Sequence, residues 1–131
     1  MNHNSRFRSW GIGAGLVAGL LISTVAQAHI TLIESSPAAD DVVASPTQID
    51  LVFNEQLVPR GSRIRLELVN EVDLDPAEAA SQHLDVQVVN GGATLRAKPH
   101  HSLGAGTYRV HWRAVGEDNH PITGEFFFSI E

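Results

Sequence analysis

The chain has 131 residues, no cysteine and a formal net charge of −6 at pH 7. The missing cysteines exclude a disulfide framework, so an exported domain of this size must rely on its hydrophobic core. The acidic balance argues against a nucleic-acid-binding protein, because the phosphate backbone binds basic surfaces, whereas an acidic surface attracts cations.

Residues 1–28 have the pattern of a cleaved secretory signal peptide. Two arginines and no acid precede the apolar run 11–25, and Ala26-Gln27-Ala28 matches a signal-peptidase site. The run is shorter than the about 20 residues of a membrane-spanning helix, which favours cleavage over an uncleaved anchor. The sequence therefore predicts export to the periplasm and a mature domain, 29–131, that begins with His29.

The mature domain is more acidic than the whole chain and has no sulfur donor. Both arginines of the leader are lost on cleavage, which leaves seven basic and 15 acidic residues and a formal charge of −8. The only methionine, Met1, is lost as well. About 100 residues suffice for one core, so we expect a single domain.

From residue 30 onward the chain has the pattern of short strands. Apolar and polar residues alternate along each run, as in half-buried strands, and Gly, Pro and Asn occupy the turns between runs. Asn90-Gly91 predicts a tight hairpin, and residues 75–81 suit one helical turn or a loop. The runs are 30–33, 49–53, 64–68, 86–89, 93–97, 108–114 and 126–130.

About seven short strands with no substantial helix predict an all-β fold. The regular turns favour an antiparallel β-sandwich or β-barrel over a parallel sheet, which would need helical connections. Without a Cys pair the domain is not of the antibody type. We therefore expect one small β domain of about seven strands without a disulfide.

Two of the six histidines in the mature domain have neighbours that suit a metal site. His120 lies in the segment Glu117–Pro121, and the proline favours an extended backbone in which Asp118 and His120 point to the same side. Cleavage before His29 would place a free amine beside the ring Nδ1, and the two nitrogens can chelate one ion. With His120 and Asp118 the set has three nitrogens and one oxygen, which suits Cu(II).

Neither half of this pattern is specific by itself. The D-x-H triplet is also a common polar turn, and Zn(II) could use the same ligands in a tetrahedral arrangement. Cu(I) prefers sulfur donors, which the mature domain lacks. The remaining histidines are interpreted as solvated or structural, with an accessory metal site left open for the first three of them. They are His83, His100, His101 and His111.

Three segments resemble the CopC family of periplasmic copper-binding proteins: AHITLIESSPAADDVVASP, IDLVFNEQL and LGAGTYRVHWRAVGEDNHPITGEFFFSI. The resemblance implies a small Greek-key β-sandwich or barrel, Ig-like or cupredoxin-like. It also implies one Cu(II) per chain, bound by His29, Asp118 and His120. Glu55 would lie nearby and hold the amine or His29, although it could equally be an acid that ends a strand.

Some family members have a methionine-rich loop that binds Cu(I). In this chain the segment 70–85 has acids instead, so we expect a Cu(II)-only protein. The predicted function is to carry, buffer or sequester copper in homeostasis or resistance, without catalysis and as a monomer. The resemblance implies a CopD-type inner-membrane transporter as partner.

Two other functions are open from the sequence. Copper mono-oxygenases use a similar N-terminal histidine chelate, but a carboxylate from Asp118 would fill a coordination position and oppose O2 activation. Alternatively, the domain is a metal-free exported β-sandwich with a structural or adhesive role, and His29 and the D-x-H triplet are coincidences. Metal ligation requires deprotonated nitrogens, so a Cu(II) protein would bind more weakly as the pH falls below neutral.

Overall fold

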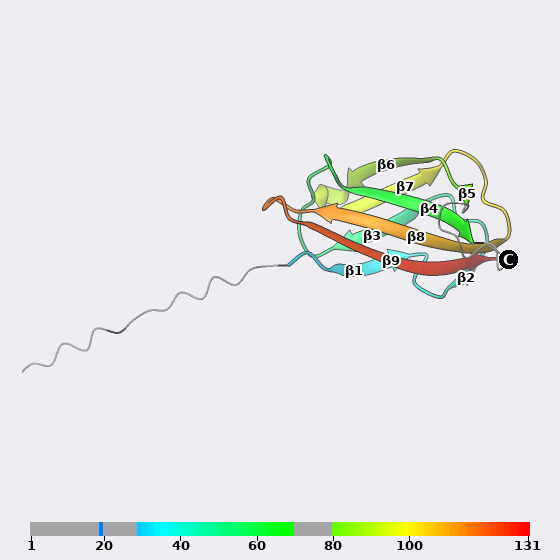
Figure 1. Ribbon diagram of the computed structural model, residues 1–131, viewed down its shortest axis with the longest axis horizontal. Coiled ribbons are helices and arrows are strands. Elements are labelled where there is room, and N and C mark those ends of the chain that lie inside the picture. Colours follow the sequence, from blue (N-terminus) through cyan, green and yellow to red (C-terminus); the bar gives the residue numbers. More distant parts are fainter. Residues whose placement is uncertain (1–18, 20–28, 70–79) are drawn as a thin grey trace, which may run out of the picture.

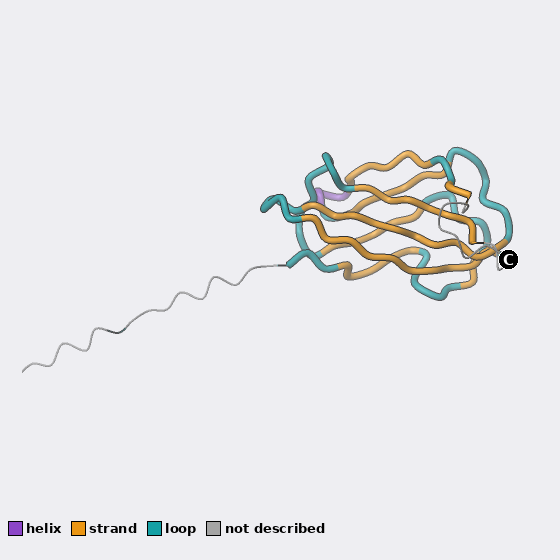
Figure 2. The backbone as a smooth tube through the Cα atoms, viewed as in Figure 1, coloured by secondary structure: helices purple, strands orange, loops and turns teal. Residues whose placement is uncertain are grey.

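Two β-sheets face each other in the computed structural model, which describes residue 19 and residues 29–69 and 80–131 (Figure 1). The strand orders are β1-β3-β7-β6 and β2-β9-β8-β4-β5. The strands run lengthwise and the loops gather at the two ends (Figure 2). The four-stranded sheet comprises β1 (Leu32–Ser36), β3 (Ile49–Phe53), β6 (Leu84–Val89) and β7 (Thr94–Pro99). The five-stranded sheet comprises β2 (Val42–Val43), β4 (Arg63–Val69), β5 (Ala80–Ser81), β8 (Gly106–Val115) and β9 (Pro121–Ile130).

The predicted all-β fold is confirmed, and each of the seven predicted runs overlaps a strand. The two further strands, β2 and β5, have two residues each, which is too short for an alternating pattern. β2 pairs with β9 in parallel. We expected an antiparallel fold, and this strand pair departs from it. Of the segment 75–81, interpreted as a helical turn or loop, residues 75–79 lie outside the described residues. Ala80 and Ser81 form β5.

The hairpin predicted at Asn90-Gly91 is confirmed. It joins β6 to β7 through the short 3-10 turn η1 (Asn90–Gly92). Asn90 and Gly91 both have positive φ angles, 53° and 74°, which Asn and Gly adopt at low cost.

The core lies between the sheets, where alternate residues of each strand point inward. Ile49 and Leu51 on β3 and Val110 on β8 are completely buried. Tyr108 is 2% exposed, and its hydroxyl donates a hydrogen bond of 2.8 Å to the Gly104 carbonyl. Burial of this hydroxyl raises the pKa of Tyr108, so the core is neutral at this position over the physiological range.

Gly124 on β9 is expected to be essential for the packing of Trp112. The two residues are paired across β8 and β9, and a Cβ on Gly124 would lie 2.3 Å from the indole. The indole also packs edge-on against Phe53, with ring centroids 5.2 Å apart, so it has little freedom to move away. We therefore expect Gly124→Ala to lower the free energy of unfolding by about 2 kcal/mol.

Thermal unfolding followed by circular dichroism measures this effect, and Gly104→Ala is the matched control. A Cβ on Gly104 would meet no atom within 4 Å, so its melting temperature should stay close to that of the wild type. A Gly124→Ala variant as stable as Gly104→Ala would contradict the packing argument.

Candidate metal site

A hollow of about 870 Å³ opens at the end of the sandwich where residue 29 meets the loop between β8 and β9. All three predicted ligands and the predicted supporting carboxylate line it, although the first and the last, His29 and His120, lie 91 positions apart in the sequence. The hollow therefore gathers the residues that sequence reasoning singled out. Its lining consists of His29, Glu55, Gln56, Glu117, Asp118, His120, Pro121 and Ile122.

Asp118 and His120 are in contact, as predicted. The Asp118 carboxylate accepts a hydrogen bond of 3.1 Å from the backbone amide of His120, and its other oxygen lies 3.3 Å from His120 Nδ1. The backbone between these two residues is not extended, as we had expected it to be. Asn119 has a φ of 62° and donates to the Gly116 carbonyl, so a turn brings the two side chains together.

This turn also changes the acidity of the carboxyl group. The backbone hydrogen bond from His120 lowers the pKa of Asp118; burial opposes this effect, and the ring of His120 adds to it. The carboxylate of Asp118 therefore stays ionised at pH values well below neutral, where it can still offer an anionic oxygen to a metal ion. The side chains of Asp118 and His120 are 59% and 82% exposed, so both have room to turn toward a shared ion.

The segment at residue 29 is held by the side chain of Asn54, at the end of β3. Asn54 Nδ2 donates to the His29 carbonyl at 3.1 Å, and Asn54 Oδ1 accepts from the Thr31 amide at 2.8 Å. The Asn54 amide donates to the Thr31 carbonyl at 3.2 Å as well. Sequence reasoning missed this clamp, because its only signal is an amide residue between the strand end and Glu55.

Ile30 fixes the same segment from the side of the core. It is 6% exposed, and its Cδ1 lies so near Gly116 that a Cβ there would approach it to 2.7 Å. Gly116 is the first residue after β8, in the loop that contains Asp118. The Asn54 clamp and the Ile30 anchor thus hold residue 29 beside that loop.

The predicted ligands line one hollow, but their side chains are not close enough together to bind one metal ion. Within residues 29–69 and 80–131, no three His, Asp or Glu side chains stand close enough to hold a metal ion. Binding would require His29 to turn toward the pair formed by Asp118 and His120. The nitrogen of His29 is a peptide nitrogen in the 131-residue chain, so the amine of the predicted chelate exists only after cleavage.

The other histidines lie elsewhere. His83 and His100 stack with ring centroids 6.2 Å apart, and His100 Nε2 lies 2.9 Å from Asp85. They stand at the ends of β6 and β7 opposite to the η1 turn, whereas Gln56 of the hollow packs near Gly92 of that turn. His101 is exposed.

His111 was interpreted as a solvated or structural residue, and the structure favours the second. It bridges β4 and β9: Nε2 lies 3.2 Å from Glu67 and Nδ1 lies 3.3 Å from Glu125. Its side chain is only 28% exposed, so it belongs to the polar network on the outer face of the sheet.

Fold and site together define a small two-layer β-sandwich that presents histidine and carboxylate side chains around one end. The CopC domain model matches residues 32–131, and the chain belongs to the CopC family. It is 38% identical to Copper resistance protein C of Pseudomonas syringae pv. tomato, over 87% of this chain and 90% of the relative. It is 39% identical to Copper resistance protein C of Escherichia coli, over 89% and 91%.

A solved structure agrees with the fold. The crystal structure of PcoC, described as a methionine-rich copper resistance protein from Escherichia coli, superposes with a TM-score of 0.71 at 36% identity. The match covers 79% of this chain and all of PcoC.

Proposed function

We propose that this chain is a periplasmic copper-binding protein that holds one Cu(II) ion in the end hollow, and carries, buffers or sequesters it in copper homeostasis or resistance. The observation that carries the proposal is that His29, Asp118 and His120 line the same hollow. The names of the relatives, copper resistance proteins, support copper as the cargo.

The donor set supports Cu(II) rather than Cu(I). Cleavage after Ala28 frees an amine that can chelate together with the imidazole of His29, while His120 adds a third nitrogen and Asp118 an anionic oxygen. Such N,O sets suit the tetragonal geometry of Cu(II). The relative PcoC is described as methionine-rich, whereas the only methionine of this chain is Met1. A thioether site for Cu(I) is therefore not part of the proposal.

Glu55 is proposed to hold the ligands rather than to bind the ion. It lines the hollow immediately after Asn54, whose side chain fixes the His29 carbonyl. A carboxylate in this place can accept a hydrogen bond from the amine of residue 29 or from its ring and keep that ligand oriented.

The proposed role is binding and transfer, without catalysis. The relatives described above are named as resistance proteins and not as enzymes, which supports this role. A CopD-type inner-membrane transporter is the proposed recipient, and the protein is proposed to act as a monomer. Among residues 19, 29–69 and 80–131, the structure has no helix of sufficient length and apolarity to cross a membrane.

The test is a Cu(II) titration followed by electron paramagnetic resonance, on protein whose N-terminus at His29 has been verified by mass spectrometry. We expect one equivalent to give a single tetragonal, nitrogen-rich signal. His120→Ala should lose that signal, and His101→Ala, the matched control, should keep it. A mixture of weak signals, or one that is unchanged in His120→Ala, would show that scattered histidines bind the ion.

Asn54 is expected to position the N-terminal ligand without touching the ion. Replacing it with alanine removes the bonds to His29 and Thr31, and the loss of such a supporting contact typically weakens metal binding by about 10- to 100-fold. We expect that loss of Cu(II) affinity in Asn54→Ala, together with faster hydrogen exchange at the Thr31 amide. Competition titration and exchange measured by NMR give the two values.

Gln56→Ala is the control for this variant. Gln56 lines the same hollow but makes no side-chain hydrogen bond within residues 29–69 and 80–131, so its loss should change neither value. If Asn54→Ala accelerated exchange at Thr31 while the affinity stayed at the wild-type level, Asn54 would have a purely structural role.

A further inference from the structure

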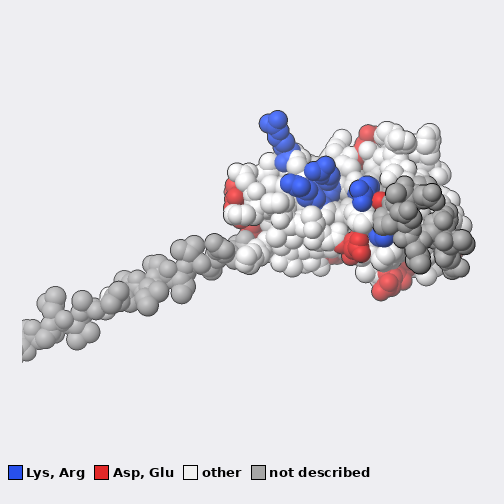
Figure 3. Space-filling view, in the orientation of Figure 1, with Lys and Arg blue, Asp and Glu red and all other residues white. Residues whose placement is uncertain are grey.

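The basic residues of this acidic domain are concentrated on one face. Residues 29–131 contain only seven arginines and lysines, and four of them lie on the neighbouring strands β4 and β8. They occupy alternate positions, opposite to the core-facing residues, and therefore share the outer face of the five-stranded sheet. Figure 3 shows basic side chains gathered on this face. The four are Arg63, Arg65, Arg109 and Arg113.

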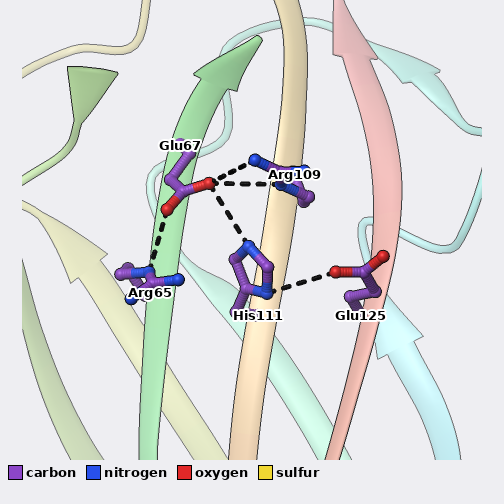
Figure 4. A network of polar contacts seen from close by, with 5 residues as sticks. All are labelled: Arg65, Glu67, Arg109, His111 and Glu125. Atoms are coloured by element: carbon purple, nitrogen blue, oxygen red, sulfur yellow. Dashed lines mark hydrogen bonds and ion pairs between the residues drawn. The ribbon is translucent and has the colours of Figure 1, made fainter. Parts of the chain in front are cut away.

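Two of these arginines form ion pairs with an acid within the sheet (Figure 4). The buried carboxylate of Glu67 lies 2.9 Å from Arg65 Nε and 2.8 Å from Arg109 Nη2. It also contacts His111, whose other ring nitrogen reaches Glu125. Each charged group of this network has its partner inside the protein, so the network needs no external ligand.

Arg63 and Arg113 have no such partner. They are directly opposite each other on β4 and β8, and like charges in that position repel. Neither guanidinium makes a hydrogen bond or ion pair with the described part of the chain. Arg113 Nε is moreover buried without any acceptor, which is unfavourable in the free protein. An anion bound from outside between the two guanidinium groups would relieve their mutual repulsion.

A hollow of about 560 Å³ adjoins this pair. Arg63 and Arg113 line it together with Thr123 and Glu125 on β9. Glu125 lies 3.3 Å from His111 Nδ1 and forms no ion pair with Arg63 or Arg113, although its charge stays in the hollow. Beside the Glu125 carboxylate and the paired Arg65, the hollow thus offers two unpaired forked cations and one hydroxyl, a set that matches the planar carboxylate group.

We propose that Arg63, Arg113 and the hollow beside them form a carboxylate-binding site that docks an acidic segment of a partner protein. A protein is favoured over an anionic membrane surface because membrane binding of this kind uses clusters of about four to eight cations. Here two cations are unpaired, on a domain whose formal charge is −8.

The docking site is adjacent to the candidate metal site. Ile122 lines the metal hollow, and the next residue, Thr123, lines the docking hollow. A partner bound through its acids would therefore lie toward the end of β9 that is nearer to His120. The inference about docking rests on the arginines alone and does not require that the protein binds copper.

The experiment measures binding of a fluorescein-labelled peptide of alternating Glu and Gly residues by fluorescence anisotropy, without added copper. We expect Arg63→Glu to weaken binding at least tenfold. Lys98→Glu, which makes the same charge change on the other sheet, should weaken it less than twofold. In wild-type NMR spectra the peptide should shift the amides of Arg63, Arg113 and Thr123.

Arg113→Lys is the second variant, because it keeps the positive charge and removes the forked guanidinium group. It should weaken binding several-fold while circular dichroism shows a folded protein. Absence of peptide binding by the wild type, or equal losses in Arg63→Glu and Lys98→Glu, would overturn the proposal. So would binding to vesicles of phosphatidylglycerol and phosphatidylcholine that depends on Arg63, since the site would then serve a membrane.

Discussion

One additional residue before His29 is expected to weaken Cu(II) binding by about a thousandfold, which corresponds to about 4 kcal/mol. The extension turns the amine of residue 29 into a peptide nitrogen, which can bind the ion only by giving up its proton, and the chelate of a free amine with the His29 ring is lost. The His29 ring, His120 and Asp118 remain as separate donors, and three separate donors hold an ion far less tightly than four that include a chelate. This is the largest effect that the proposed site predicts.

Competition titration against a Cu(II) chelator of known affinity gives the value. A glycine added after Glu131 is the matched control, because it lengthens the chain by one residue at the other terminus and should leave the affinity unchanged. Equal Cu(II) affinities for the two extended forms would mean that the free amine of His29 is not a ligand.

Glu67→Gln is expected to have the largest effect on stability. The carboxylate of Glu67 is 5% exposed and binds Arg109, Arg65 and His111. Its removal leaves the half-buried Arg109 without a counter-charge, and breaking a buried ion pair in this way costs about 3 kcal/mol. For a domain of about 100 residues the melting temperature should fall by roughly 10 to 20 °C.

The pH dependence of this effect has a definite sign. Burial raises the pKa of Glu67, but the Arg109 hydrogen bond and the charges of Arg65 and His111 outweigh it, and the pKa lies below its ordinary value of 4.5. A carboxyl group with a depressed pKa in the folded state contributes stability above its ordinary pKa and loses that contribution in acid. The difference in stability between wild type and Glu67→Gln should therefore be largest above pH 4.5 and shrink below it.

Urea unfolding at neutral pH and at a pH below 4.5 tests both parts of this expectation. Glu34→Gln is the control, since the Glu34 side chain is exposed and forms no ion pair in the described part of the chain. A loss in Glu67→Gln no greater than that in Glu34→Gln would mean that the network contributes little.

Most of the fold could be predicted because the strands are half-buried. Apolar and polar residues alternate along β3 and β8, and this alternation shows in the sequence which side chains face the core. Asn90-Gly91 indicates a hairpin because both residues adopt positive φ angles at low cost. The strands β2 and β5 have only two residues each, and two residues are too few to show an alternating pattern. β2 pairs with β9, which lies far away in the sequence, whereas β5 pairs with the preceding strand β4.

The candidate site was only partly predictable. The D-x-H triplet and the predicted N-terminus indicated His29, Asp118 and His120, and the structure places all three around one hollow. The contact between Asp118 and His120 depends on the positive φ of Asn119, which the following proline does not reveal. The Asn54 clamp depends on the end of β3 lying beside residue 29, and that proximity exists only in the folded sandwich.

The Asn54 clamp has a consequence for the order of events during export. It binds the residue that directly follows the predicted scissile bond, and it closes only when β3 has formed. A peptidase needs several extended residues on both sides of its bond, so a closed clamp would shield Ala28-His29 from cleavage. We therefore expect leader removal to precede folding of this end, and chains that fold first to retain a blocked His29.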